Sequence, residues 1–326
     1  MSETGSNPVP APHRDRSAGL VIFGVLTILF GTICALLVPL MVISQTMTPA
    51  QVNPGGMQAI IPAALMYLGL AVILIWLGIG SIKARRWARA LLVILFWGWL
   101  LVGVFSVVAT ALVMPPIMTS IQAMQPGGQP PLPSSAIPVM ITISLVILGL
   151  VFVVIPGIGV LFYSSSHVRA TCEARDPVTR WTDACPLPVL AAVLWLALMV
   201  PMILLAPLSA RGVLPFFGVV LTGWPALLGY VIIAAFWAWS ALAMYRLDVR
   251  GWWVLLVSFA ILTLSNVVMY SQYNLVEILE LMRYPEAQLA MFRKMPLFNG
   301  RAMAWGMGLF SIPFFAYLWY IKRFFP

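Results

Sequence analysis

The sequence predicts an all-α integral membrane protein with about eight transmembrane helices and both termini in the cytosol. Three observations lead to this prediction: the composition, the length of the apolar runs and the placement of the positive charges. Hydrophobic residues make up 62% of the 326 residues, and charged residues only 8%. A soluble domain has about 25% charged residues, so this composition is typical of a polytopic membrane protein.

Apolar runs long enough to cross a bilayer occur eight times along the chain. An α-helix needs about 20 residues to cross a hydrocarbon core of about 30 Å. The runs begin near Gly19, Gln58, Arg89, Ile137, Leu187, Val213, Trp252 and Ala302. Residues 1–18, before the first run, are polar and rich in Pro and Ser, which predicts a disordered cytosolic tail.

Positive charges alternate between the two sides of the predicted spans and thereby set the orientation. With the N-terminus inside the cell, 13 of the 18 Lys and Arg residues face the cytosol. Loops rich in Lys and Arg normally stay on that side, and an even number of spans returns the C-terminus to it. We therefore expect a multi-pass protein of the plasma membrane, and the compact loops favour a bacterial inner membrane.

The predicted spans divide into two four-helix units. Residues 19–163 form the first unit, residues 164–186 a cytosolic connector, and residues 187–326 the second unit. Setting Trp87 against Trp252 also pairs Arg85 with Arg250, so two parallel repeats are one interpretation. Independent anchoring of each Arg and Trp at the headgroup level is the alternative.

Small residues and prolines predict how the helices pack and bend. Gly24 and Gly31 lie seven residues apart on one helix face, as do Gly149 and Pro156, which predicts close helix approach at both pairs. Pro156 also opens the run Pro-Gly-Ile-Gly, where we expect the strongest kink.

The outer segment 274–295 differs from every other loop. Asn274 is placed to cap a short helix, and Pro285 predicts a break followed by a second one. The apolar faces of the two predicted helices are formed by Leu275, Ile278, Met282, Leu289 and Phe292. These amphipathic helices could lie on the membrane surface, cover the bundle as a lid, or dock a partner protein.

The sequence predicts no catalytic residue, no metal site and no cofactor. The central parts of the predicted spans contain no ionisable side chain, which disfavours transport through a buried carboxylate and voltage sensing. His167, Cys172 and Cys185 lack the paired short spacing of a zinc site. The positive charge follows membrane topology, so we expect no nucleic-acid partner.

The seventh predicted span carries the only marked polarity within the membrane. Thr263, Asn266 and Tyr270 follow an i, i+3, i+7 spacing and therefore share one helix face. This stripe could line a path or a site for a neutral ligand. Interhelical hydrogen bonding by Asn266 is the alternative explanation.

These observations favour a non-catalytic accessory, assembly or scaffold component of a membrane complex. Its partners are the lipid bilayer and a protein that docks on segment 274–295. The alternative is a channel or carrier for a neutral or apolar solute, using the stripe on span seven. A lipid-modifying enzyme that uses Glu277, Glu280 or the His167 region is a weaker alternative.

Overall fold

A computed structural model describes residues 15–47, 56–123, 136–210, 212–282, 284, 286–293 and 300–326. Eight helical segments are long and apolar enough to cross a membrane, which confirms the predicted all-α multi-pass membrane fold. Most of the predicted tail, residues 1–14, lies outside the described residues, and Ser17 already belongs to the first helix.

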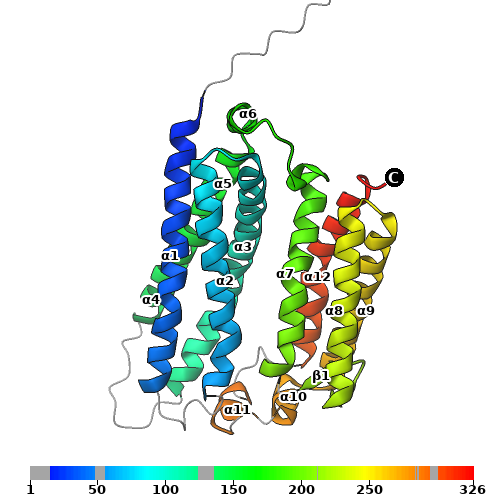
Figure 1. Cartoon of the computed structure of the whole chain (residues 1–326). Helices are drawn as coiled ribbons and strands as arrows, with labels where there is room; N and C mark the ends of the chain where they lie inside the picture. The colour runs from blue at the N-terminus through cyan, green and yellow to red at the C-terminus, as the bar shows by residue number, and fades with distance from the viewer. Residues whose placement is uncertain are drawn as a thin grey trace, which may run out of the picture.

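The first half of the chain forms one up-and-down bundle of four spans (Figure 1). The fourth span consists of three consecutive pieces, α4, the π-helical turn η1 and α5. The elements are α1 (Ser17–Met47), α2 (Gly56–Ile82), α3 (Arg86–Ala123), α4 (Ala136–Gly149), η1 (Leu150–Val154) and α5 (Ile155–Ser164).

The connector and the second bundle follow in the same up-and-down order. A β-hairpin and a pair of short helices lie at the far end of the molecule. The elements are α6 (Ser166–Arg175), η2 (Trp181–Asp183), α7 (Leu187–Ser209), β1 (Val213–Phe216), β2 (Val219–Thr222), α8 (Trp224–Tyr245), α9 (Val249–Gln272), α10 (Leu275–Leu281), α11 (Glu286–Arg293) and α12 (Gly300–Lys322).

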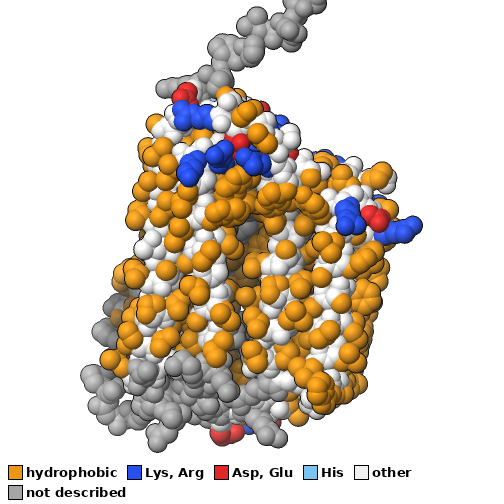
Figure 2. Space-filling model, in the orientation of Figure 1, with side chains coloured by type: hydrophobic (Ala, Val, Ile, Leu, Met, Phe, Trp, Pro, Cys, Tyr) orange, Lys and Arg blue, Asp and Glu red, His pale blue; other side chains and the backbone are white. Residues whose placement is uncertain are grey.

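The start of α1 and the end of α12 lie at the same end of the molecule (Figure 1). We call this the basic end, because the α2–α3 turn, the connector and the end of α12 place their Lys and Arg side chains there (Figure 2). The opposite end, which carries the hairpin, α10 and α11, is the distal end. Between the two ends the exposed surface is almost entirely hydrophobic, as contact with a lipid bilayer requires.

Glycines allow α1 and α2 to pack closely, as predicted for Gly24 and Gly31. A Cβ atom at Gly24 would lie 2.8 Å from the carbonyl oxygen of Gly78. At Gly31 it would lie 3.0 Å from the carbonyl oxygen of Ala71. Lipid offers no hydrophobic force between helices, so backbone approach of this kind is a main source of packing energy in a membrane.

The fourth span is distorted immediately before Pro156. The turn Leu150–Val154 is π-helical and precedes the run Pro156–Gly159, where a kink was predicted and where α5 is a regular helix. A Cβ atom at Gly103 of α3 would overlap the carbonyl oxygen of Phe152 in this turn. The predicted close approach at Gly149 is wrong, because nothing lies within 4 Å of a Cβ atom built there. The π turn moves the contact to Phe152 instead.

Each bundle is also joined by polar contacts near the basic end. In the first bundle the Ser81 hydroxyl donates to the Leu20 carbonyl at 2.9 Å and lies 2.6 Å from the Tyr163 hydroxyl. In the second bundle the Trp252 indole donates to the Leu318 carbonyl at 2.8 Å. The Ser81, Tyr163 and Trp252 side chains are buried. The Ser81–Leu20 bond joins α2 to α1, and the Ser81–Tyr163 and Trp252–Leu318 bonds tie the last span of each bundle to an earlier one.

The two bundles meet mainly where α2 and α3 of the first bundle lie against α7 of the second. Ile94 packs with Leu190 of α7, and the Trp195 ring lies against Gly98. Farther along, Phe105 and Phe310 make an edge-on contact with 4.4 Å between ring centroids. Figure 2 shows a narrow hollow between the bundles with hydrophobic side chains on its walls.

The sixth span begins later than predicted. The prediction placed its start near Val213, but residues 213–222 form an antiparallel hairpin and α8 begins at Trp224. Phe217 and Gly218 take positive φ values of 46° and 77°, as a two-residue hairpin turn requires. An apolar run of this length has the same composition in a strand as in a helix, which is why the sequence was misleading here.

We expect Gly103→Ala to lower stability by about 1 to 3 kcal/mol, because the added methyl meets a backbone carbonyl that no rotamer change can move. Gly149→Ala is the matched control, since its methyl enters open space and Ala is the better helix former. Thermal unfolding of both variants in detergent micelles measures the difference. Equal melting temperatures for the two variants would contradict the packing at the π turn.

Candidate functional site

A buried carboxylate organises the basic end of the first bundle. The Asp176 side chain is only 2% exposed and lies 3.4 Å from Arg85 and 3.3 Å from Arg180. Its second oxygen accepts the backbone N–H of Arg86 at 3.4 Å, at the first residue of α3. A negative charge at a helix N-terminus is favourable, so Asp176 both caps α3 and neutralises two arginines.

The connector extends from this carboxylate to both bundles. Arg86 pairs with Asp183 at 3.6 Å, and Asp183 also accepts the backbone N–H of Arg180 at 2.9 Å. The Tyr245 hydroxyl of α8 donates to the Trp181 carbonyl at 2.9 Å. The connector is therefore a folded element, and it fixes the two bundles relative to each other at the basic end.

The Asp176 pKa reflects these contacts. Burial acts to raise it, but the hydrogen bond from Arg180, the N–H of Arg86 and the nearby guanidinium charges outweigh burial and lower the pKa below its ordinary value of 3.8. The charged form is thus the one that the folded protein stabilises.

The connector thiols have surroundings that suppress reactivity. Cys172 is buried in the core of the first bundle, and burial raises its pKa to about 11. Cys185 packs with Ile94 and Leu190, and burial raises its pKa as well. His167 lies exposed in the first turn of α6. In the described part of the chain, no three His, Cys, Asp or Glu side chains are grouped so that they could hold a metal ion.

The distal end carries a compact structure that we call the distal cover, formed by the β1–β2 hairpin, α10 and α11. Asn274 caps α10, as predicted: its backbone N–H donates to Glu277 at 3.0 Å in a reciprocal capping box. The Asn274 side-chain oxygen also accepts the N–H of Gly300 at 3.0 Å, so the cap joins α10 to the start of α12. The predicted break at Pro285 falls on a residue outside those described.

The predicted apolar faces of α10 and α11 turn partly into the protein. Ile278 is 2% exposed and Leu289 3% exposed, whereas Leu275, Met282 and Phe292 are half-buried. Arg293 bridges the two helices from the outside, with 2.5 Å to both Glu280 and Glu286. The two short helices therefore form one unit in which Ile278 and Leu289 are buried.

The predicted polar stripe on α9 is present but makes no described bond to another helix. Thr263, Asn266 and Tyr270 are half-buried, and the Asn266 amide donates at 2.8 Å to Leu262 of its own helix. The bond between elements comes from buried Ser265, whose hydroxyl accepts the N–H of Phe217 in the hairpin turn at 2.9 Å. Sequence reasoning missed Ser265, because its partner segment was read as helix.

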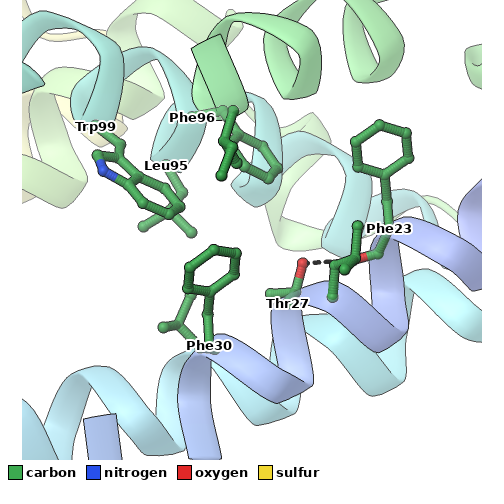
Figure 3. A pocket seen from close by; sticks show the side chains of 9 residues that line it. Phe23, Thr27, Phe30, Leu95, Phe96 and Trp99 are labelled. Carbon is green, nitrogen blue, oxygen red and sulfur yellow. Dashed lines mark hydrogen bonds between the residues drawn. The ribbon is translucent and has the colours of Figure 1, made fainter. Parts of the chain in front are cut away.

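A small cavity lies inside the first bundle between α1 and α3. Phe23 and Phe30 face Phe96 and Trp99 across it (Figure 3). Its volume is ≈ 30 Å³, far below the roughly 300 to 1,000 Å³ of typical ligand pockets. The Thr27 hydroxyl donates to the Phe23 carbonyl at 2.7 Å, so the walls leave little for water to bind. This cavity is a packing gap.

Neither protein-family models, nor curated proteins, nor solved structures gave a match to this chain. The fold and the side-chain chemistry therefore define its class, a multi-pass α-helical membrane protein with eight candidate spans. Within that class, the distal cover and the basic end are the two places where polar side chains gather.

We expect Asp176→Asn to destabilise the protein by about 1 to 3 kcal/mol at pH 7, because two arginines lose their buried counter-charge.

The lowered Asp176 pKa adds stability that is complete above pH 3.8 and is lost as the pH falls through the folded-state pKa. The variant should therefore lose less stability on acidification than the wild type. Glu173→Gln is the control: it breaks a single exposed pair, which contributes about 0.3 to 0.5 kcal/mol. Thermal unfolding between pH 7 and pH 3 measures both effects, and equal acid sensitivity of wild type and Asp176→Asn would refute them.

We expect Gly300→Ala to loosen the distal cover. A Cβ atom there would overlap the Tyr270 carbonyl oxygen and lie 2.7 Å from that of Tyr273. Limited proteolysis should then cut α10 and α11 faster than in the wild type. Gly308→Ala, whose nearest neighbour is a side-chain atom at 4.0 Å, should keep the wild-type pattern. Identical cleavage of all three proteins would be evidence against the Gly300 junction.

Proposed function

We propose that this protein is a non-catalytic accessory, assembly or scaffold component of a membrane complex, and that the distal cover is the surface that meets a partner protein. The single observation that supports this most is the Arg293 bridge, which holds α10 and α11 together from their water-facing side. Anchoring in a bilayer does not need such a bridge. A binding surface gains from one, because a fixed shape lowers the entropy lost on association.

The exposures of the predicted docking residues refine this proposal. Ile278 and Leu289 support the cover from within, so contact with a partner would fall to Leu275, Met282 and Phe292 at its edges. The structure adds Leu281, which is 49% exposed at the end of α10. An exposed apolar side chain among the charged groups Glu280 and Glu286 is typical of a protein interface with a polar rim.

We infer the orientation of the protein and the membrane that holds it from the distribution of its charges. The basic end would face the cytosol and the distal cover would lie outside, in the plasma membrane of the cell or the inner membrane of a bacterium. The partner would then be a protein on the outer side or another membrane protein with an outer domain.

The alternative, a channel or carrier for a neutral or apolar solute, would use the Thr263, Asn266 and Tyr270 stripe. The cavity of ≈ 30 Å³ lies in the other bundle, away from this stripe. The open apolar groove of ≈ 520 Å³ in this bundle does not include the stripe, since it is lined by Ile232, Ala235, Phe236, Trp239 and Val254. The Asn266 amide is also occupied by its own helix. The distal cover is therefore the better-supported proposal.

The test is purification from native membranes in a mild detergent, followed by native mass spectrometry of the intact particle. We expect the wild type to carry a stoichiometric protein partner and Leu281→Arg to lose it, because a charge is placed on the apolar part of the proposed contact. Val178→Arg is the matched control, since Val178 is an apolar residue, 57% exposed, at the opposite end. A wild-type particle with the mass of this chain alone, or equal retention of the partner in both variants, would remove the proposal.

A further inference from the structure

Aromatic rings hold the two cations at the end of α12 in place. The Lys322 ammonium lies 5.1 Å from the ring centroids of Trp252 and Trp253, and 5.0 Å from that of Trp319. The neighbouring Arg323 guanidinium lies 4.0 Å from the Tyr320 ring centroid. The negative face of an aromatic ring attracts a cation at such distances. Lys322 is therefore already restricted to one place before any ligand binds.

Lys322 has hydrogen-bond donors for which the described residues provide no acceptor. An ammonium group carries three N–H donors. Ring faces attract its charge, but no carboxylate or carbonyl of the described chain accepts from it. Its donors therefore remain available to a group that comes from outside the protein.

The surroundings of Lys322 differ from the basic end of the first bundle. There, Arg85 and Arg180 share the buried carboxylate of Asp176. At the basic end of the second bundle the chain carries four cations, Arg246, Arg250, Lys322 and Arg323, and among the side chains only Asp248 is acidic. Asp248 caps α9 by accepting the Arg250 backbone N–H at 2.9 Å. The charge near Lys322 is therefore left positive.

Trp252, Trp253 and Trp319, which surround the Lys322 ammonium and which we call the tryptophan cage, provide two further indole N–H donors. Trp252 is fully buried and its indole N–H is used by the Leu318 carbonyl. Trp253 is 47% exposed and Trp319 68% exposed, and no described residue accepts from their indole N–H groups. Tryptophans at the end of a span lie at the level of lipid headgroups. The Lys322 ammonium and the rings of Trp253 and Trp319 thus lie together at that level.

We propose that Lys322, with Trp253 and Trp319, binds the phosphate of an anionic phospholipid headgroup in the leaflet at the basic end. A phosphate supplies the negative charge and the acceptor oxygens that this group of donors lacks. Anionic lipids attract basic residues at a membrane surface, and the aromatic cage makes this lysine a fixed site instead of a mobile charge. The proposal does not depend on the function proposed for the distal cover.

The experiment uses the full chain in detergent micelles and titrates in phosphatidylglycerol, phosphatidylcholine or inorganic phosphate, with bound ligand counted by native mass spectrometry. We expect phosphatidylglycerol to bind and Lys322→Gln to lower its affinity about ten-fold or more. Loss of any single surface cation should lower the affinity only about five-fold. Arg323→Gln removes the same charge one residue away and is the matched control. Trp319→Leu keeps every charge and should still weaken binding.

Two results would overturn the proposal. The first is an equal loss in Lys322→Gln and Arg323→Gln with wild-type binding in Trp319→Leu, which would mean diffuse surface charge only. The second is saturable binding of inorganic phosphate with no gain from the lipid, which would mean a free phosphate site. Lys322→Arg keeps the charge, and together with Trp319→Leu it carries the test if Lys322→Gln does not fold.

Discussion

Inside a lipid bilayer every polar group must find its hydrogen-bond partner within the protein, and the whole structure depends on this constraint. Most polar side chains of the described spans obey it, whereas the buried Trp237 indole N–H and Ser240 hydroxyl of α8 have no hydrogen-bond partner among the described residues. Thr27 donates to Phe23 of its own helix, Ser81 joins Leu20 and Tyr163, and Trp252 donates to Leu318. Charged side chains that are exposed to the surroundings therefore lie at the two ends of the molecule.

Because polar side chains are few within the spans, close contact between helix backbones supplies much of the packing energy. Gly24 and Gly31 bring α1 against α2, and Gly103 admits the π turn of the fourth span. Within each bundle the helices thus fit closely. Between the bundles the main contact is that of α2 and α3 with α7, and the folded connector around Asp176 and Asp183 supports it at the basic end.

The two ends use their charges differently. At the basic end of the first bundle, carboxylates of the connector neutralise the arginines and the result is a structural joint. At the same end of the second bundle, aromatic rings hold Lys322 and no carboxylate opposes it. At the distal end, Arg293 and Asn274 hold a small cover in a defined shape. The joint gives rigidity, and the other two places are those at which we propose contacts with other molecules.

Sequence alone determined the eight spans, because only a helix of sufficient length satisfies its backbone in hydrocarbon. It also located the cap at Asn274 and the close approach of Gly24 and Gly31, since both are local patterns. Only the tertiary structure decided that residues 213–222 form a hairpin, that Ser265 and not Asn266 bonds another element, and that Asp176 caps α3. The reason is physical: each of these depends on a partner distant in the chain, and an apolar run or a single polar residue has no feature that identifies that partner.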